Sequence, residues 1–239
     1  GDGIQVRRGG GRHSCAVRGR RAVRRALRER SFDVVVEDIN KVPLFLPFVT
    51  RLPLVAIVPH LFGTTAFAEA SAPMAAIVWA AELPIPRVYR RAAFHAISES
   101  TRDDLVARGV NASRVRVVHC GLNHDRYSAD ASVPKAEEPT LVFVGRLRRY
   151  KGLDWVLRTL PRVREKVPGL VLDVIGDGPW QEALVRQARG LGLEGAVRFH
   201  GFLPAAEKVR RMRAAWALLQ PSPKEGWGLT VVEAGACGT

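Results

Sequence analysis

Short runs of apolar and β-branched residues alternate with longer amphipathic stretches along the 239-residue chain. Several runs are apolar at nearly every position, as in strands that are covered on both faces. The pattern predicts strands at residues 33–37, 54–58, 94–97, 115–119, 140–144, 170–175, 197–200 and 217–220. It predicts helices at residues 17–29, 74–91, 101–108, 154–166, 181–191 and 205–215. This alternation is typical of parallel sheets with right-handed crossovers, so we expect an α/β fold.

One stretch without apolar periodicity divides the chain. Residues 123–138 are rich in Ser, Ala, Pro and charged residues, a composition that is typical of a linker. The strand pattern begins again at Thr140. We therefore expect two α/β domains, residues 1–122 and residues 139–239, joined by residues 123–138.

The positive charge of the chain is concentrated at its start. The sequence carries 37 Lys and Arg against 23 Asp and Glu, and ten of the arginines lie in residues 1–30. No DNA- or RNA-binding motif accompanies this charge, which disfavours nucleic acid as the partner. Anionic lipid headgroups, phosphate-bearing substrates and plain solvated surface are the other interpretations of a basic surface.

The spacing of the cysteines and the length of the apolar runs indicate the cellular compartment. Cys15, Cys120 and Cys237 lie far apart and form no C-x-x-C pair, which fits a reduced cytosol and supports neither disulfides nor structural zinc. The apolar stretch 70–81 contains Pro73 and is shorter than the ~20 residues that span a bilayer. We expect a cytoplasmic protein, with peripheral contact at the inner face of the membrane as an alternative; the oligomeric state is not predicted.

Arg146 and Lys151 form a first candidate pair, between a predicted strand and the next helix. In open α/β sheets, ligands bind outside the carboxyl ends of the strands. A guanidinium offers a planar fork for phosphate oxygens, and a lysine supplies a compact mobile charge. Both could therefore converge on a diphosphate near the helix N-terminus. A solvated loop is the alternative, because Arg148 and Arg149 lie beside them.

Glu225 and Glu233 form a second pair. The first lies in a glycine-flanked turn and the second on the short helix that follows. One carboxylate can accept hydrogen bonds from sugar hydroxyls and the other can bridge a ribose diol, each bond contributing about 1.5–3 kcal/mol. The apolar neighbours predict a buried helix, where an unpaired carboxylate would be costly; they are Leu229, Val231, Val232 and Ala234. An ordinary helix-face charge is the alternative for Glu233.

Together these motifs resemble glycosyltransferase family 4 (glycosyl transferases group 1). The matching segments are Val144-Gly145-Arg146-Leu147 with Lys151-Gly152, the glycine turn Gly176-Asp177-Gly178-Pro179, Pro221-Ser222 with Glu225 and Glu233, and His119-Cys120-Gly121-Leu122-Asn123. Cys120 stands where the family usually has Asn. The glycine turn lacks the third glycine of a dinucleotide fingerprint, so it gives little support for NAD. The match is specific in residues 140–239 and weaker before residue 90.

The resemblance implies a GT-B fold, in which two Rossmann-like domains with parallel sheets face a cleft, here truncated at both ends. Residues 1–122 would be a partial acceptor-side domain and residues 139–239 a partial nucleotide-sugar domain. The family's glycine-rich acceptor loop and its closing C-terminal helices are absent. We therefore expect low or no activity from this chain alone.

The resemblance also implies roles for individual residues. Arg146 and Lys151 would bind the donor diphosphate and stabilise its charge as it departs. Glu225 would contact the donor sugar, Glu233 the ribose hydroxyls, and His60 would face the anomeric carbon unless it is a structural loop histidine. The further residues implied at the donor are Gly176, Phe202, Leu203, Gly226, Gly228 and Leu229, with Phe202 and Leu203 near the base. Residues that either line the acceptor side or only cap local turns are Asp38, Asn40 and Lys41. Ser98 and Glu99 match a Ser-(Glu) turn of the family, where their role is either catalytic or one of packing and capping.

The function implied is a retaining transfer of a hexosyl unit from a UDP- or GDP-linked sugar to a hydroxyl of a sugar or lipid-linked acceptor. Same-face attack would be guided by the leaving phosphate. The sequence has no Asp-x-Asp motif, so no metal and no cofactor beyond the donor substrate are expected. A sugar epimerase or phosphorylase of the same fold is one alternative. The other is a basic phospholipid- or nucleic-acid-binding module that uses the arginine-rich start.

Overall fold

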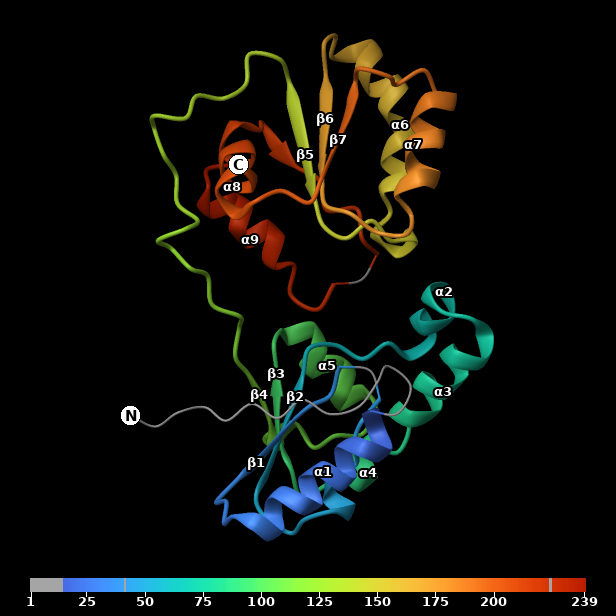
Figure 1. The fold of residues 1–239 in the computed structure, drawn as a ribbon, viewed down its shortest axis with the longest axis vertical. Helices are drawn as coiled ribbons and strands as arrows, with labels where there is room; N and C mark the ends of the chain where they lie inside the picture. The colour runs from blue at the N-terminus through green and yellow to red at the C-terminus, as the bar shows by residue number, and fades with distance from the viewer. Residues whose placement is uncertain (1–14, 41, 224) are drawn as a thin grey trace. The chain divides into compact units, whose positions relative to one another are not determined.

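The computed structural model describes residues 15–40, 42–223 and 225–239. The chain divides into two compact units between His119 and Cys120. Each unit is built around a sheet of four parallel strands, with helices between them (Figure 1). The expected class, two α/β units with parallel sheets, is confirmed.

The first unit carries its strands in the order β1-β2-β3-β4. The strands are β1 Val35–Asp38, β2 Leu54–Val58, β3 Ala93–Ala96 and β4 Val115–Val117. The helices are α1 Cys15–Glu29, α2 Ala66–Glu69, α3 Ala72–Glu82, α4 Ile85–Val88 and α5 Glu99–Ala107. Ala56, Val58, Phe94 and Ala96 lie in its core, where Leu105 of α5 and Tyr89 pack against them.

The single helix predicted at residues 74–91 is wrong. The structure has two helices there, α3 and α4, because the chain turns at Leu83 and Pro84. Proline has no amide hydrogen to donate and restricts the residue before it, so Pro84 and Pro86 interrupt a helix that the apolar composition would otherwise continue.

The second unit has the strand order β7-β6-β5-β8. The strands are β5 Thr140–Val144, β6 Val171–Ile175, β7 Val197–Gly201 and β8 Ala217–Leu218. The helices are α6 Leu153–Lys166, α7 Gln181–Gly190, α8 Ala205–Ala214 and α9 Leu229–Ala236. Successive strand side chains point to opposite faces. Leu172 and Val174 therefore pack with α6 and α7, whereas Val142 and Ile175 pack toward Ala215 on the other face.

Residues 123–138 contain no helix or strand, and they pack against the second unit. Tyr127 is buried with Met212 of α8 and Ala234 of α9. The ammonium of Lys135 donates to the carbonyl of Ala215 at 2.7 Å. The segment expected to link the domains is therefore anchored along α8 by both an aromatic ring and hydrogen bonds.

Two glycines allow three loops of the second unit to meet. Gly176, which follows β6, has φ +129°, and a Cβ there would lie 2.1 Å from the carbonyl oxygen of Gly145 in the loop after β5. Gly152, at the end of that same loop, has φ +72°, and its Cβ would lie 2.6 Å from the carbonyl oxygen of Pro221 after β8. A side chain at either position would force these loops apart.

Among the described residues, no helix is both long enough and apolar enough to cross a bilayer.

The close approach at Gly176 predicts a large cost for adding one methyl group. We expect Gly176→Ala to lower the free energy of unfolding by about 3 kcal/mol, through backbone strain and overpacking. Gly190, at the end of α7, has open space around the added Cβ, so Gly190→Ala should raise stability by about 0.5 kcal/mol. Urea unfolding followed by circular dichroism measures both variants. Equal effects of the two substitutions would contradict the close approach.

Candidate functional site

The loops at the carboxyl ends of β5, β6 and β7 are joined by backbone hydrogen bonds. Leu147 donates to the carbonyl of Asp177 at 2.7 Å, and Trp180 donates back to the carbonyl of Leu147 at 3.1 Å. Gly176 donates to the carbonyl of Gly201 at 2.7 Å. Parallel strands end at one edge of their sheet, so these bonds and the glycine contacts described above fix the loops after β5, β6 and β8, with the end of β7 beside them, into one rigid rim where ligands of α/β folds bind.

Lys151 and Glu225 meet at this rim. The Lys151 ammonium contacts Glu225 Oε1 at 2.5 Å, and Gln220 Nε2 donates to the same oxygen at 2.7 Å. Both side chains are largely buried, with 15% of Lys151 and 28% of Glu225 exposed. The structure thus brings together two residues that are 74 positions apart and were expected to share a site.

Further cations lie on the same loop. Arg146 follows β5 and is exposed, as are Arg148 and Arg149. The Arg149 guanidinium lies 5.9 Å from the centre of the Trp180 ring, which keeps it beside the glycine turn. Like charges so close together repel one another, and a polyanion bound at the rim would relieve that repulsion.

Glu233 is buried and paired, but on a different set of partners. Its Oε2 accepts from the Lys208 ammonium of α8 at 3.1 Å, and the same ammonium donates to the Tyr127 hydroxyl at 2.6 Å. Burial by itself lowers the pKa of Lys208, but its hydrogen bonds to Tyr127 and Glu233 outweigh that effect, so the pKa is raised. The buried carboxylate therefore has the compensating charge that its burial requires.

The prediction of a buried helix is confirmed for one stripe of α9 and wrong for the rest of it. Leu229, Val231 and Val232 are exposed, with 49% of the Val231 side chain in contact with solvent. Ala234 and Glu233 are buried instead, because α9 packs one stripe against Tyr127 and Met212. The apolar composition of the helix predicted burial but could not indicate which stripe is covered.

The remaining residues expected at the donor lie on the loops of the same unit. Phe202 follows β7 and is 81% exposed, whereas Leu203 packs against the cluster of Val142, Ile175 and Ala215. Gly226 is half-buried in the turn after Glu225. Gly228 has φ +75° and precedes the first residue of α9, Leu229.

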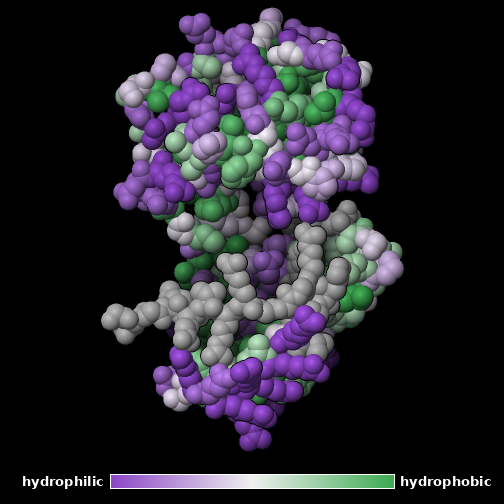
Figure 2. Space-filling view, in the orientation of Figure 1, coloured by the Kyte–Doolittle hydropathy of each residue, from purple (hydrophilic) through white to green (hydrophobic). Residues whose placement is uncertain are grey.

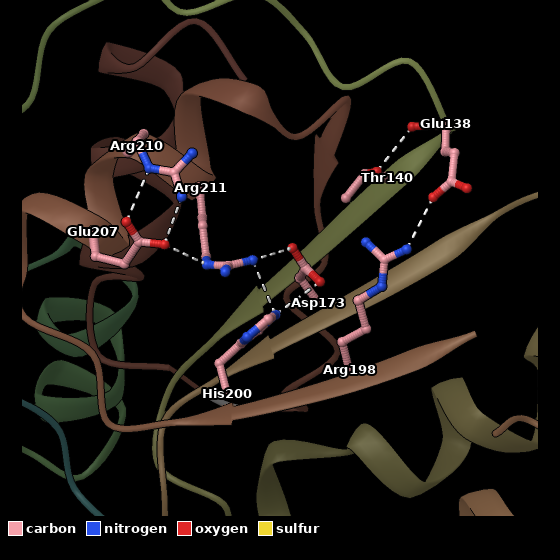
Figure 3. Close-up of polar contacts among 8 residues, drawn as sticks. All are labelled: Glu138, Thr140, Asp173, Arg198, His200, Glu207, Arg210 and Arg211. Atoms are coloured by element: carbon pink, nitrogen blue, oxygen red, sulfur yellow. Dashed lines mark hydrogen bonds and ion pairs between the residues drawn. The ribbon is translucent and has the colours of Figure 1, made fainter. Parts of the chain in front are cut away.

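A buried polar network underlies the loop that carries Phe202 (Figure 3). Asp173 of β6 accepts from His200 Nε2 at 2.9 Å and from Arg211 Nη1 at 3.3 Å. His200 Nε2 lies between the two charged groups, 2.9 Å from Asp173 Oδ1 and 3.2 Å from Arg211 Nη1. Glu207 binds the Arg211 Nε at 2.9 Å. The network ties α8 to β6 and to the end of β7.

In the first unit, the loop that carries His60 is held by a buried carboxylate. Glu82, at the end of α3, accepts from the backbone amides of Phe62 at 2.7 Å and Gly63 at 2.8 Å. Arg108 Nη1 lies 3.3 Å from the same carboxylate. The His60 ring lies 4.5 Å from the Phe62 ring, centre to centre. His60 is thus set on a fixed loop, and its catalytic role stays a prediction.

The other residues expected on the acceptor side have simpler surroundings. Ser98 caps α5 by accepting from the Thr101 amide at 3.2 Å. Glu99 pairs with His119 at 3.0 Å, a hydrogen bond that lowers the pKa of Glu99. Asp38, the last residue of β1, and Asn40, which follows the strand, are exposed. Lys41 and the arginines of residues 1–14 lie outside the described residues.

Sequence reasoning missed three groups that hold this arrangement together. Asp173 interrupts an otherwise apolar strand, and Glu82 ends an otherwise apolar helix; either signal could have been used. Nothing in the sequence pairs Lys208 with Tyr127, 81 residues away, because neither lies in a recognisable motif.

Comparison with known families accounts for nearly the whole chain. The family model for Glycosyltransferase Family 4 matches residues 3–126, and that for Glycosyl transferases group 1 matches residues 126–239. The two matches meet at Arg126, seven residues after the boundary between the two compact units.

Curated relatives are matched over part of their length. The glycogen synthase of Mycobacterium tuberculosis (strain ATCC 25618 / H37Rv) is 34% identical over 143 residues, which cover 59% of this chain and 34% of the relative. The GDP-mannose-dependent alpha-(1-6)-phosphatidylinositol monomannoside mannosyltransferase of Mycolicibacterium smegmatis is 32% identical over 133 residues, covering 49% of this chain and 35% of the relative. The chain thus spans about a third of these relatives.

Solved structures share the fold at low identity. Anabaena Alr3699/HepE, in complex with UDP and glucose, gives a TM-score of 0.73 at 20% identity, over 95% of this chain and 63% of that one. Sucrose-phosphate synthase from Thermosynechococcus elongatus gives a TM-score of 0.75 at 18% identity, over 97% and 61%. Two parallel-sheet units of this kind form the GT-B fold. With the family matches over both halves, the chain belongs to glycosyltransferase family 4.

Proposed function

We propose that the second unit binds a nucleotide-diphosphate sugar at the rim formed by the loops after β5, β6 and β8. The chain would then be part of a retaining, metal-independent glycosyltransferase that moves a hexosyl unit to an acceptor hydroxyl. The observation that carries the proposal is the contact of Lys151 with Glu225 at the place where glycines hold these loops together. A cation and a carboxylate at one glycine-lined edge suit a ligand with both phosphates and hydroxyls.

The cations would hold the diphosphate. Arg146 is exposed, and its planar guanidinium can bind two phosphate oxygens at once. Glu225 holds the Lys151 ammonium at the rim, so its charge lies where the phosphates would bind. When the phosphates bind, the ammonium would turn toward them, because two phosphate charges attract it more strongly than one carboxylate does.

The carboxylates would hold the sugars of the donor. Once Lys151 turns to the phosphates, Glu225 would accept hydrogen bonds from hydroxyls of the transferred sugar, while Gln220 keeps it oriented. Glu233 would accept from the ribose hydroxyls, with Lys208 bound to Oε2 and offsetting its charge. Phe202, exposed after β7, would offer an aromatic face to the base.

Transfer would follow from how the leaving group is held. The acceptor oxygen forms a bond to the anomeric carbon as the bond from that carbon to the phosphate oxygen breaks. The acceptor hydroxyl gives its proton to the departing phosphate, on the same face of the sugar, so the configuration is retained. Arg146 and Lys151 stabilise the negative charge that develops on the phosphate, which is the usual source of large rate enhancements.

The relatives support a hexosyl donor and an acceptor that bears a hydroxyl. Their names include a glycogen synthase, a mannosyltransferase that uses GDP-mannose and acts on a phosphatidylinositol monomannoside, and a D-inositol 3-phosphate glycosyltransferase of Thermobifida fusca. We therefore propose UDP- or GDP-linked hexoses as donors and a sugar or lipid-linked acceptor.

Binding of the donor should depend on Arg146. Arg146→Ala should weaken the binding of UDP-glucose or GDP-mannose 10- to 100-fold, because one charge-assisted contact to phosphate contributes about 1.5–3 kcal/mol. Isothermal titration calorimetry with each nucleotide sugar measures the change. Arg148→Ala is the matched control, since it removes the same charge from the same exposed loop. Equal weakening by both substitutions would mean that the loop attracts the phosphates only through its overall charge, which would contradict a specific site at Arg146.

The products of the reaction should show a retaining, metal-independent transfer. In assays of donor turnover with glucose- and inositol-based acceptors, the transferred hexose should keep the anomeric configuration that it has in the donor. Excess EDTA should leave the rate unchanged, because the cations of the protein replace a metal. NMR of the anomeric signals identifies the product and separates transfer from isomerisation and phosphorolysis. An inverted product, or a rate abolished by EDTA, would contradict this part of the proposal.

A further inference from the structure

Helix α3 in the first unit is apolar on every side. From Ala72 to Ala81 the sequence has no charged side chain, and the one N–H donor among its side chains is the indole of Trp79. One stripe of the helix, formed by Ala75, Val78 and Glu82, is buried. The opposite side of a surface helix normally carries charged and polar residues. Here it carries more apolar residues, so the composition of α3 is not explained by packing within the unit.

Large apolar side chains are exposed along α2, α3 and the turn that follows, and we call this set the α3 patch. Its residues are Phe67 of α2, Met74, Ile77 and Trp79 of α3, and Leu83 at the turn that follows. Ile77 is 56% exposed and Leu83 is 50% exposed. Figure 2 shows hydrophobic side chains over the position of α2 and α3 in Figure 1. Large exposed sets of apolar side chains mark interaction sites.

The patch is held by contacts behind it. Ala75 and Val78 pack with Ala66 of α2 against Phe62 and Val42. Glu82 fixes the end of the helix through the loop amides and Arg108 described above. The apolar side chains are therefore presented on a fixed framework, and their exposure does not come from a frayed helix end.

Positive charge borders the patch at its end. Arg87, Arg90 and Arg91 are exposed, and the Arg87 amide donates to the carbonyl of Pro84 at 3.1 Å, one turn after Leu83. The sequence has no acidic residue from 83 to 98 that could balance these arginines. Residues 1–119 as a whole hold 19 Lys and Arg against 10 Asp and Glu.

We propose that the α3 patch docks on an anionic lipid bilayer. Apolar side chains that enter the acyl boundary, a tryptophan at the flank and arginines at the headgroup level are the features that hold a helix in a membrane interface. The excess of positive charge in the first unit favours a polyanionic surface over a second copy of this basic chain, whose own arginines would oppose it. The site lies in the first unit and uses none of the residues proposed to bind the donor.

Flotation with vesicles of 70% phosphatidylcholine and 30% phosphatidylglycerol tests the proposal with the chain as it stands. Ile77→Glu should lower the fraction bound at least tenfold, because a carboxylate replaces an inserted side chain. Arg90→Glu should lower it at least fivefold, and pure phosphatidylcholine vesicles should bind the unchanged chain several times more weakly. Val163→Glu is the matched control, since Val163 is an exposed valine on α6 and its substitution should leave binding unchanged.

Thermal unfolding and far-UV circular dichroism show whether each variant is folded, whereas UDP-glucose titration checks the second unit alone. Leu83→Glu, placed at a turn rather than within α3, serves as a second variant if Ile77→Glu unfolds, and it should lose binding to the same extent. Vesicle binding that survives both substitutions in folded protein would overturn the proposal. So would a concentration-dependent dimer in light scattering that Ile77→Glu dissociates, because the patch would then be covered by a second copy.

Discussion

The functional edge of the second unit depends on backbones that touch where a Cβ would not fit. Gly176 lies against Gly145, and Gly152 lies against Pro221, so that the loops after β5, β6 and β8 share one surface. This contact is what allows Lys151 and Glu225 to reach each other across 74 positions of sequence. The phosphate-binding and sugar-binding chemistry proposed for the chain therefore rests on the absence of side chains at a few positions.

Both units use buried carboxylates as anchors. Glu37 accepts from the Leu46 amide at 3.2 Å and from the Tyr89 hydroxyl at 2.8 Å, and Glu82 accepts from two amides of the His60 loop. In the second unit, Asp173 and Glu233 are paired with cations of α8. A buried carboxylate is costly unless its oxygens are bonded, so each anchor specifies one position for the segment that it binds. The segments fixed in this way include those expected to face the substrates.

The sequence predicted the arrangement of strands well because periodicity reports burial directly. The strands 54–58 and 140–144 match their predicted bounds, and the other strands differ by a few residues at their ends. The helix at 74–91 was predicted wrongly because its apolar residues continued through Pro84 and Pro86. Apolar composition also misled at α3 and α9, where it reflects exposed surface as well as core.

The sequence could predict those parts of the site in which a short motif contains residue types that suit the ligand. The loop of Arg146 and Lys151 and the turn of Glu225 could be identified because their residue types and spacing suit phosphates and hydroxyls. The partners of Glu233 could not, since Lys208 and Tyr127 reach it only through the packing of α8 and of residues 123–138. Long-range pairs of this kind depend on the tertiary fold, which a single sequence does not display.

The central claim is that the rim of the second unit is the nucleotide-binding surface, and a backbone-amide NMR titration with UDP tests it most directly. The account predicts that the largest shifts fall on residues 145–152, 176–180 and 225–229, which lie in the loops after β5, β6 and β8. Shifts confined to the first unit, or to exposed arginines far from these loops, would contradict it.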